Sequence, residues 1–140
     1  MELAAALDFA GTTRHGTLVT TRSNGRPQLS NIVHSVSADG LIRISITAER
    51  AKYRNMLRDP WVALHVSRSD FYAYAVIEGD VTLSAVAAAP DDPAVDELVE
   101  LYREISGEHE DWDDYRAAMV RDHRVVARIA PTRAYGMLPS

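Results

Sequence analysis

The 140-residue chain contains no cysteine, a single lysine and no apolar run near the roughly 20 residues that a membrane helix requires. Without cysteine, disulfides and thiolate metal sites are excluded. Residues 1–11 lack the basic region and the long apolar segment of a secretory signal, so we expect a cytoplasmic protein that does not cross a membrane. The formal net charge of −5 argues against nucleic-acid binding, which normally needs a basic face.

Motifs for catalysis by protein side chains are also missing. The sequence has no GxSxG nucleophile turn and no glycine-rich phosphate loop. Its five histidines form no HExxH or HxH pair, and His109 lies among acidic residues in what reads as a solvated loop. We therefore expect no metal site and name no catalytic residue. Any reactivity is expected to come from a bound cofactor.

The hydrophobic pattern predicts one domain over residues 1–140, mainly β with added helices (α+β). Alternation with a period of two predicts strands, and an Asn24-Gly25 turn joins the first two as a hairpin. The period changes to about 3.6 after Pro90, where Asp91 or Asp92 is the expected helix cap. We expect a six-stranded, mostly antiparallel barrel with helices packed outside. The predicted strands are residues 16–22, 27–37, 41–47, 61–67, 72–86 and 125–130, with a further edge at 134–137; the predicted helices are residues 1–10, 50–59 and two segments between 91 and 122.

The only lysine lies in the segment TAERAKYRNMLRDP, residues 47–60. If one of residues 47–49 caps the helix, Arg50 and Lys52 fall in its first turn, where the helix dipole disfavours cations. A bound anion would offset that cost, and free N–H groups at a helix start together with Arg and Lys bind phosphate well. The sequence therefore favours a phosphate site over an ordinary solvated helix.

Two further groups of residues allow a structural or a functional interpretation. Gln28, Ser30 and Asn31 place amide and hydroxyl groups on a strand, either as exposed sheet positions or as partners for the edge of a flat heteroaromatic ring. Tyr72 and Tyr74 share one face of the expected strand 72–86, where they either pack in a core or dimer interface or line a ring pocket.

Several segments in order resemble one family: GRPQLSN, RAKYRNMLRDP, YAVIEG, LYREISGEHEDWDDYRAAM and YGM. The chain is similar, from about Gly16 to Met137, to the FMN-binding split β-barrel proteins related to pyridoxamine 5′-phosphate oxidase. Within these flavin and deazaflavin oxidoreductases it most resembles the actinobacterial branch that uses coenzyme F420.

The resemblance implies a homodimer of split barrels with a cofactor site at each end of the interface. By similarity, Arg50 and Lys52 bind the cofactor phosphate, with Tyr53 and Asn55 adjacent. Gln28, Ser30 and Asn31 lie along the deazaflavin ring, with Ile46 beneath it. Tyr72 and Tyr74 reach the pocket from the other subunit. Family members often carry a small hydroxyl residue at the position of Tyr53 and tryptophan at that of Tyr72.

The function that the resemblance implies is F420-dependent reduction, in which a hydride passes from the reduced deazaflavin to a small planar electrophilic acceptor. An FMN-dependent oxidase or reductase of the same fold is an alternative, because both cofactors offer a phosphate to Arg50 and Lys52. A protein that binds or carries F420 without turnover is the other alternative, because no catalytic side chain is evident.

Overall fold

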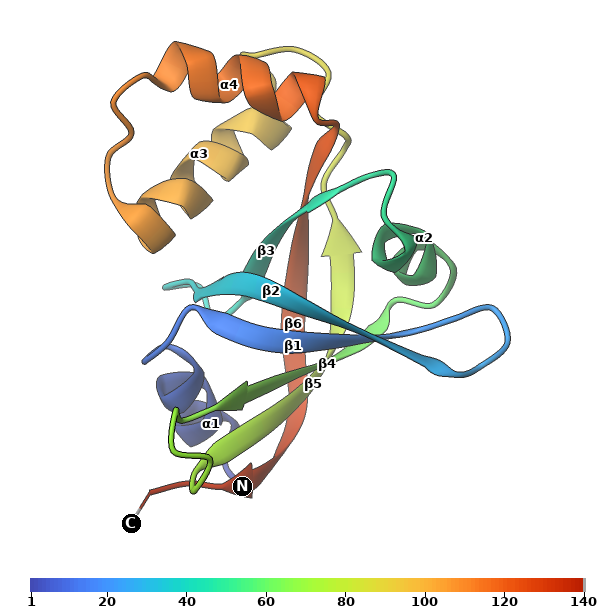
Figure 1. Cartoon of the computed structure of the whole chain (residues 1–140), viewed down its shortest axis with the longest axis vertical. Helices are drawn as coiled ribbons and strands as arrows, with labels where there is room; N and C mark the ends of the chain where they lie inside the picture. The colour runs from blue at the N-terminus through green and yellow to red at the C-terminus, as the bar shows by residue number, and fades with distance from the viewer. Residues whose placement is uncertain (140) are drawn as a thin grey trace.

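The computed structural model describes residues 1–139, whose six strands close into one antiparallel barrel (Figure 1). The order around the barrel is β1-β2-β3-β6-β5-β4, and the helices lie outside it. This arrangement confirms the predicted fold class. The strands are β1 (His15–Thr21), β2 (Pro27–Val36), β3 (Ile42–Thr47), β4 (Trp61–Ser67), β5 (Tyr74–Leu83) and β6 (Arg124–Met137); the helices are α1 (Leu3–Ala10), α2 (Ala51–Arg58), α3 (Pro93–Ser106) and α4 (Trp112–Arg121).

The core of the barrel follows from the alternation seen in the sequence. Ile42, Ile44 and Ile46 of β3 point inward and are fully buried, while the residues between them face outward. Helix α1 adds the buried Ala6 and Ala10 to this core, and α2 adds Met56. The two helices thereby extend the buried core beyond the strands.

The barrel is split between β2 and β3. These strands pair at only three positions, from His34 opposite Ile44 to Val36 opposite Ile42. Toward the beginning of β2 and the end of β3 the two strands separate, whereas residues 27–33 of β2 stay paired with β1. Helix α2 follows shortly after the end of β3 that is not paired with β2. The separated strand ends therefore provide two walls of an opening whose far side lies near the start of α2.

The hairpin between β1 and β2 forms at the predicted turn. The Arg22 N–H donates to the Arg26 carbonyl at 2.8 Å and the Gly25 N–H to the Arg22 carbonyl at 2.9 Å. Only Gly25, with φ of 83°, has the left-handed conformation, although both turn residues can adopt it. The hairpin extends beyond the barrel on the side of α2 (Figure 1).

Strands β5 and β6 differ from the sequence prediction at their ends. The strand expected at 72–86 spans Tyr74–Leu83, so Tyr72 precedes it. The segments 125–130 and 134–137, predicted separately, form one continuous strand. The pairing register shifts between Glu78 and Gly79, which marks a β-bulge, and a side chain at Gly79 would meet the Ala130 carbonyl oxygen at 2.6 Å. This bulge lets β6 continue past Pro131, which cannot donate a ladder hydrogen bond.

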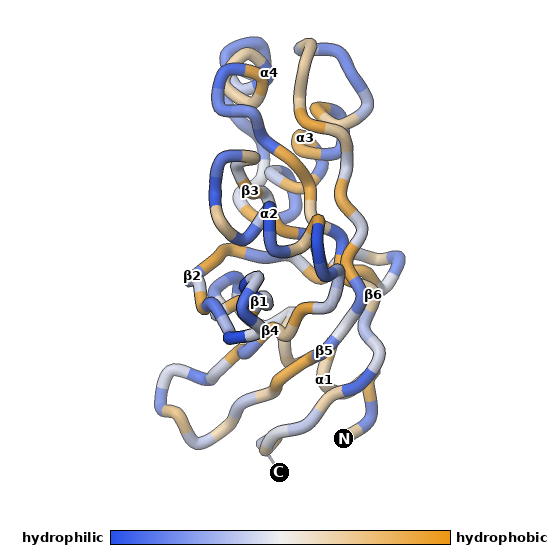
Figure 2. Tube along the Cα trace, turned by 90° about the vertical axis from the view of Figure 1, so that its right-hand side faces the viewer, coloured by the Kyte–Doolittle hydropathy of each residue, from blue (hydrophilic) through white to orange (hydrophobic). Residues whose placement is uncertain are grey.

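Helices α3 and α4 pack on the outer face of β6 and form a second, smaller core. Asp92 caps α3 by accepting from the Val95 N–H at 2.9 Å, as one of the two predicted caps. Figure 2 shows hydrophobic and hydrophilic stretches alternating along both helices, as expected for helices with one buried face. No helix within residues 1–139 is long and apolar enough to cross a membrane. The buried members of this core are Ala87, Val95, Leu98, Val99, Met119 and Val126.

Candidate functional site

The start of α2 places two cations where the helix dipole is positive. Arg50 occupies the N-cap position itself rather than the first turn, so the prediction that one of residues 47–49 caps the helix is wrong. Its side chain makes no capping hydrogen bond, and the first turn contains no acidic residue. Lys52 lies in that turn, as predicted. The helix dipole does not stabilise a positive charge at either residue. Neither side chain can accept a hydrogen bond from the N–H groups at the helix start, which leaves those groups for an external acceptor.

A third cation, Arg124, lies beside these two. Partial burial lowers the pKa of Lys52 below its ordinary value, and the charges of Arg50 and Arg124 lower it further. Arg124 begins β6 and pairs with Thr47, the last residue of β3, which brings it next to α2. Sequence reasoning missed Arg124, because only the register of β3 against β6 brings it across 72 positions from Lys52. We call Arg50, Lys52 and Arg124 the cation cluster.

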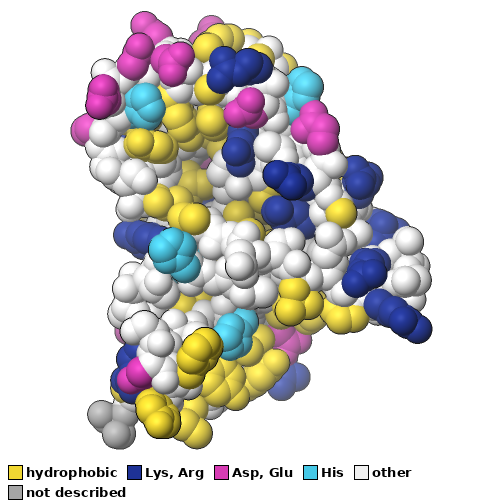
Figure 3. Space-filling view, viewed as in Figure 1, with side chains coloured by type: hydrophobic (Ala, Val, Ile, Leu, Met, Phe, Trp, Pro, Cys, Tyr) yellow, Lys and Arg dark blue, Asp and Glu magenta, His cyan; other side chains and the backbone are white. Residues whose placement is uncertain are grey.

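The cation cluster lies in a cavity of about 710 Å³ between the separated strand ends and the helices α3 and α4. Figure 3 shows this side of the molecule, with Lys and Arg side chains gathered near α2 and acidic side chains over α3 and α4. Among the described residues that line the cavity, none is Asp or Glu. The lining residues are Ser30, Asn31, Ile32 and Val33 of β2, Ser45, Ile46 and Thr47 of β3, the cation cluster, and Leu101, Tyr102, Ile105, Tyr115 and Met119 of α3 and α4.

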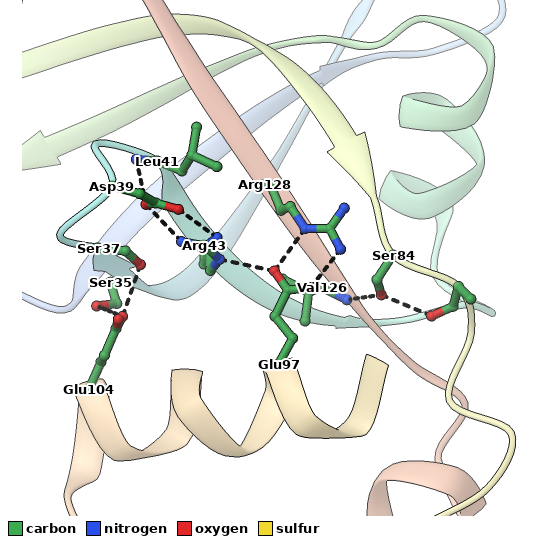
Figure 4. Close-up of polar contacts among 11 residues, drawn as sticks. Ser35, Ser37, Asp39, Leu41, Arg43, Ser84, Glu97, Glu104, Val126 and Arg128 are labelled. Carbon is green, nitrogen blue, oxygen red and sulfur yellow. Dashed lines mark hydrogen bonds and ion pairs between the residues drawn. The ribbon is translucent and has the colours of Figure 1, made fainter. Parts of the chain in front are cut away.

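Helix α3 is held over the sheet by ion pairs on the outer surface of the barrel (Figure 4). Glu97 accepts from Arg128 at 2.6 and 2.7 Å and from Arg43 at 3.0 Å. These guanidinium groups, Arg128 before Arg43, hold the pKa of the Glu97 carboxyl below its usual value. About two turns further along α3, the Glu104 carboxylate accepts hydrogen bonds from the hydroxyls of Ser35 at 2.7 Å and Ser37 at 3.0 Å. The wall that α3 gives to the cavity is therefore fixed to β2, β3 and β6.

The segment GEHEDWDDYR builds the corner between α3 and α4. The rings of Tyr102, His109, Trp112 and Tyr115 lie 5.0–5.6 Å apart, centroid to centroid. The expected exposed acidic loop is present at residues 107–111, and within it His109 is half-buried among aromatic rings. The Tyr115 hydroxyl donates to the Leu98 carbonyl at 3.0 Å, and burial raises its pKa to about 12. Tyr115 therefore lends its ring to the cavity, while its hydroxyl is committed to α3.

Half of the predicted binding residues meet in the cavity. Arg50 and Lys52 line it together with Ser30, Asn31 and Ile46. Ile46 is fully buried beneath the split, and Ser30 and Asn31 lie on the free part of β2. The sequence pattern had placed these residues on three separate segments, and the split between β2 and β3 brings the segments to one opening.

Three other predicted residues lie behind the cavity wall. The buried Asn55 side chain donates to the Thr20 hydroxyl at 3.0 Å and to the Gln28 amide oxygen at 3.3 Å. It also accepts from Arg58 at 3.0 Å. Tyr53 packs against the barrel core. Within this chain Asn55 and Gln28 thus fasten α2 to the β1–β2 hairpin, and Tyr53 packs on the core; none of the three lines the cavity.

Tyr72 and Tyr74 lie away from the cavity of the same chain. Tyr72 is 78% exposed in the loop before β5. The ring of Tyr74, on the outer face of the barrel, lies 5.7 Å from that of His65. Within residues 1–139, no group of three His, Cys, Asp or Glu side chains is arranged to hold a metal ion.

Comparison with known proteins agrees with this architecture. The family described as pyridoxamine 5'-phosphate oxidase matches residues 3–138. The chain belongs to this family. The match spans the barrel and the α3–α4 insertion, so every wall of the cavity is a part of the family's domain.

Three solved structures are similar to this fold. A conserved hypothetical protein from Mycobacterium tuberculosis is 25% identical, with a TM-score of 0.75 over 100% of this chain and 90% of that one. A protein named F420 reductase is also 25% identical, with a TM-score of 0.68 over 91% of this chain and 94% of the other. An FMN-binding, pyridoxamine 5'-phosphate oxidase-related protein from Nostoc punctiforme shares the fold at 16% identity, with a TM-score of 0.59 over 96% of this chain and 80% of that one.

Proposed function

We propose that the protein is an F420-dependent oxidoreductase whose cofactor binds in the cavity at the barrel split. The observation that carries this proposal is the cation cluster, three positive side chains at one cavity without a carboxylate in the lining. Such a site is costly without a ligand and fits a phosphate-bearing one. Membership of the family and the likeness to an F420 reductase support the choice of cofactor.

The residues of the cavity suit a flat ring attached to a phosphate. Arg50 and Lys52 would hold the phosphate at the start of α2. Ser30 and Asn31 offer hydrogen bonds along the free part of β2, and Ile46 offers an apolar floor. The bound deazaflavin would supply the hydride, and the protein would supply binding, orientation and exclusion of water. A small planar electrophilic acceptor would stack on the exposed face of the ring.

We infer that the functional unit is a homodimer. The outer face of β1, β2, β4, β5 and β6 carries exposed apolar side chains, including Leu29, Val33, Tyr135 and Met137. The strand pairing shows that these side chains share one face of the sheet. Residues that pair directly across the strands form a row from Tyr135 of β6 to Asn31 of β2; the row is Tyr135, Val76, His65, Thr17 and Asn31. A face of this kind favours association, because covering it removes apolar surface from water. Asn31 also lines the cavity, so a second subunit on this face would reach its mouth, where Tyr72 and Tyr74 of that subunit would complete it.

The cofactor is tested by titrating the purified protein with F420 and, in parallel, with FMN. We expect F420 to bind more tightly. Clearly tighter binding of FMN would replace the proposal with the FMN-dependent alternative, which uses the same cation cluster and the same fold.

Turnover is tested by adding reduced F420 and a panel of planar electrophilic acceptors, and by following the return of oxidised deazaflavin by its absorbance. An acceptor-dependent rate supports an enzyme. Tight F420 binding with no turnover on any acceptor would instead support a protein that stores or delivers the cofactor, which the lack of a catalytic side chain also fits.

A further inference from the structure

The state of the Arg124 side chain is unusual among the arginines of the chain. Its Nε is buried and has no hydrogen-bond partner within residues 1–139. Its Nη1 reaches the Ser45 carbonyl only at 3.5 Å, the long limit of a hydrogen bond. Buried guanidinium nitrogens normally have partners, because leaving a charged donor unpaired costs free energy. Arg124 also lines the cavity, so a guanidinium group with few partners inside the protein forms part of the cavity wall.

The local backbone holds Arg124 against α2 independently of any ligand. The Ala48 N–H donates to the His123 carbonyl at 3.0 Å, and His123 Nδ1 contacts the Glu49 carboxylate. His123 adopts a left-handed conformation with φ of 52°, which turns the chain from α4 into β6. These contacts join the residue before Arg124 to the residues before Arg50, so protein contacts alone hold the backbone of these two cations side by side.

The charge of the cluster is not balanced within the protein. Among the ion pairs of residues 1–139, none includes Arg50, Lys52 or Arg124. Glu49, the acidic residue nearest in sequence, is paired with His123 and does not line the cavity. A single negative charge would leave two of the three cations uncompensated at close range.

We propose that Arg124 is a third anion-binding residue of this site, and that the cavity selects ligands whose anionic end carries at least two negative charges. Resting on the proposed cofactor site, this inference defines its chemistry: a phosphomonoester, or a phosphodiester with a carboxylate close to it. Arg124 contributes a planar guanidinium that binds two oxygens, whereas Lys52 contributes a point charge.

A matched pair of small phosphates tests the charge requirement on the unaltered protein. Methyl phosphate carries about two negative charges at pH 8 and dimethyl phosphate carries one, with nearly the same size. Phosphorus NMR titration should show methyl phosphate binding at least about tenfold more tightly, the effect of one charge-assisted contact. Equal affinities would overturn the charge requirement, whatever cofactor the protein uses.

Substitution tests the residue itself. Arg124→Gln should weaken methyl phosphate and the phosphate-bearing cofactor by about 10- to 100-fold, and should leave binding of phosphate-free riboflavin unchanged. The matched control is Arg121→Gln, an arginine of α4 whose side chain is 69% exposed and whose Nε lies 3.8 Å from the Asp122 carboxylate. The control should bind like the wild type. Arg124→Lys should recover part of the affinity by restoring the charge.

The two proposals fail in different ways. Unchanged methyl phosphate binding in Arg124→Gln, together with weakened binding in Lys52→Gln, overturns the role of Arg124 and leaves the cofactor site standing. Binding of methyl phosphate that depends on Arg124, with no binding of F420 or FMN, overturns the proposed function and leaves the anion site standing. The comparison of the two phosphates on the wild type holds even if the variant does not fold.

Discussion

At the scale of single residues, the molecule places charge where folding alone disfavours it. Lys52 lies at the positive end of α2, and burial together with Arg50 and Arg124 lowers its pKa. A lowered pKa means that the folded protein disfavours the charged form of this lysine. The ligand-free protein is therefore less stable at neutral pH than it would be without that charge. Such local costs are typical of binding sites.

Replacing this lysine should therefore separate stability from binding. We expect Lys52→Met to raise the free energy of unfolding of the ligand-free protein at pH 7 by about 0.3–1 kcal/mol, the cost of a cation at a helix start. It should also weaken F420 or FMN binding about tenfold or more. Chemical denaturation and equilibrium titration measure the two effects. Arg54→Met, one position beyond the first turn, is the control; an equal loss of affinity there would contradict a specific role for Lys52.

A second residue-scale prediction concerns pH. His34 is fully buried, its Nε2 bonds to the Ala10 carbonyl at 2.9 Å, and its Nδ1 has no partner within residues 1–139. Burial lowers the pKa of His34 below 6.5, and the charge of Arg14 lowers it further. Below about pH 6.5 the unfolded chain binds a proton that the folded chain excludes, so stability falls as the pH falls.

The dependence of the free energy of unfolding on pH measures the effect of His34. Between pH 7.5 and pH 5, the free energy of unfolding of the wild type should decrease more steeply than that of His34→Leu, although the variant is less stable at pH 7.5. Denaturant titrations at several pH values compare the two. Equal slopes would show that the His34 pKa is not lowered in the folded protein.

The sequence predicted the position of a residue correctly where the signal was local. Arg50 and Lys52 were found from their place at a helix start, and this needed only the sequence of that helix. Arg124 was missed because its role depends on the pairing of β6 with β3, which no local pattern reports. Gln28 and Asn55 show the opposite error. Their polar side chains suggested ligand binding in the sequence, but in the fold they form a hydrogen bond with each other.

At the scale of elements, the α3–α4 insertion converts the barrel split into a cavity. Its amphipathic period and the Asp92 cap made both helices predictable. Their position over β3 and β6 was not predictable, because it depends on Glu97 and Glu104 meeting partners from distant strands (Figure 4). The sequence did not predict that β6 is one continuous strand, for a different reason. Pro131 indicates a strand end, and only the bulge beside Gly79 lets the pairing continue.

Glu97 offers a test of how the insertion is held. We expect Glu97→Gln to lower the free energy of unfolding at pH 7 by about 1–3 kcal/mol, because it weakens charged hydrogen bonds to Arg128 and Arg43. Its lowered pKa means that the carboxylate stabilises the fold above about pH 4.5, and that this contribution is lost as the pH falls through the folded value. The wild type and the variant should therefore converge in acid. A constant difference across this range, in denaturation measured against the exposed control Asp113→Asn, would contradict the ion-pair account.

At the scale of the whole molecule, charge and apolar surface are separated. Acidic side chains cover α3 and α4, basic ones gather near α2, and apolar ones remain exposed on the outer face of the barrel (Figure 3). The fold class was predictable at this scale, because alternating strands with short turns and few helices allow few compact arrangements. The surface that we assign to a second subunit was not predictable from alternation, since exposed leucine and valine read as ordinary strand residues.

The inferred dimer predicts an asymmetry between two equally exposed leucines. Leu29, on the outer face of β2, is 62% exposed, and Leu57, on α2, is 60% exposed. Leu29→Lys should shift the protein to a monomer, because it would bury a charge in the interface, whereas Leu57→Lys should leave the dimer intact. Sedimentation velocity distinguishes the two. A wild-type monomer, or a dimer that persists in Leu29→Lys, would contradict the inferred interface.

In the proposed function, the cavity at the barrel split binds a phosphate-bearing deazaflavin through the cation cluster. The most direct measurement is an equilibrium titration of F420 into the wild type and into the double variant Arg50→Gln, Lys52→Gln, with FMN titrated in parallel. The account predicts tight F420 binding to the wild type, weaker FMN binding, and a loss of F420 affinity of at least about 100-fold in the variant, from two charge-assisted contacts. Equal F420 affinity in the two proteins would contradict it.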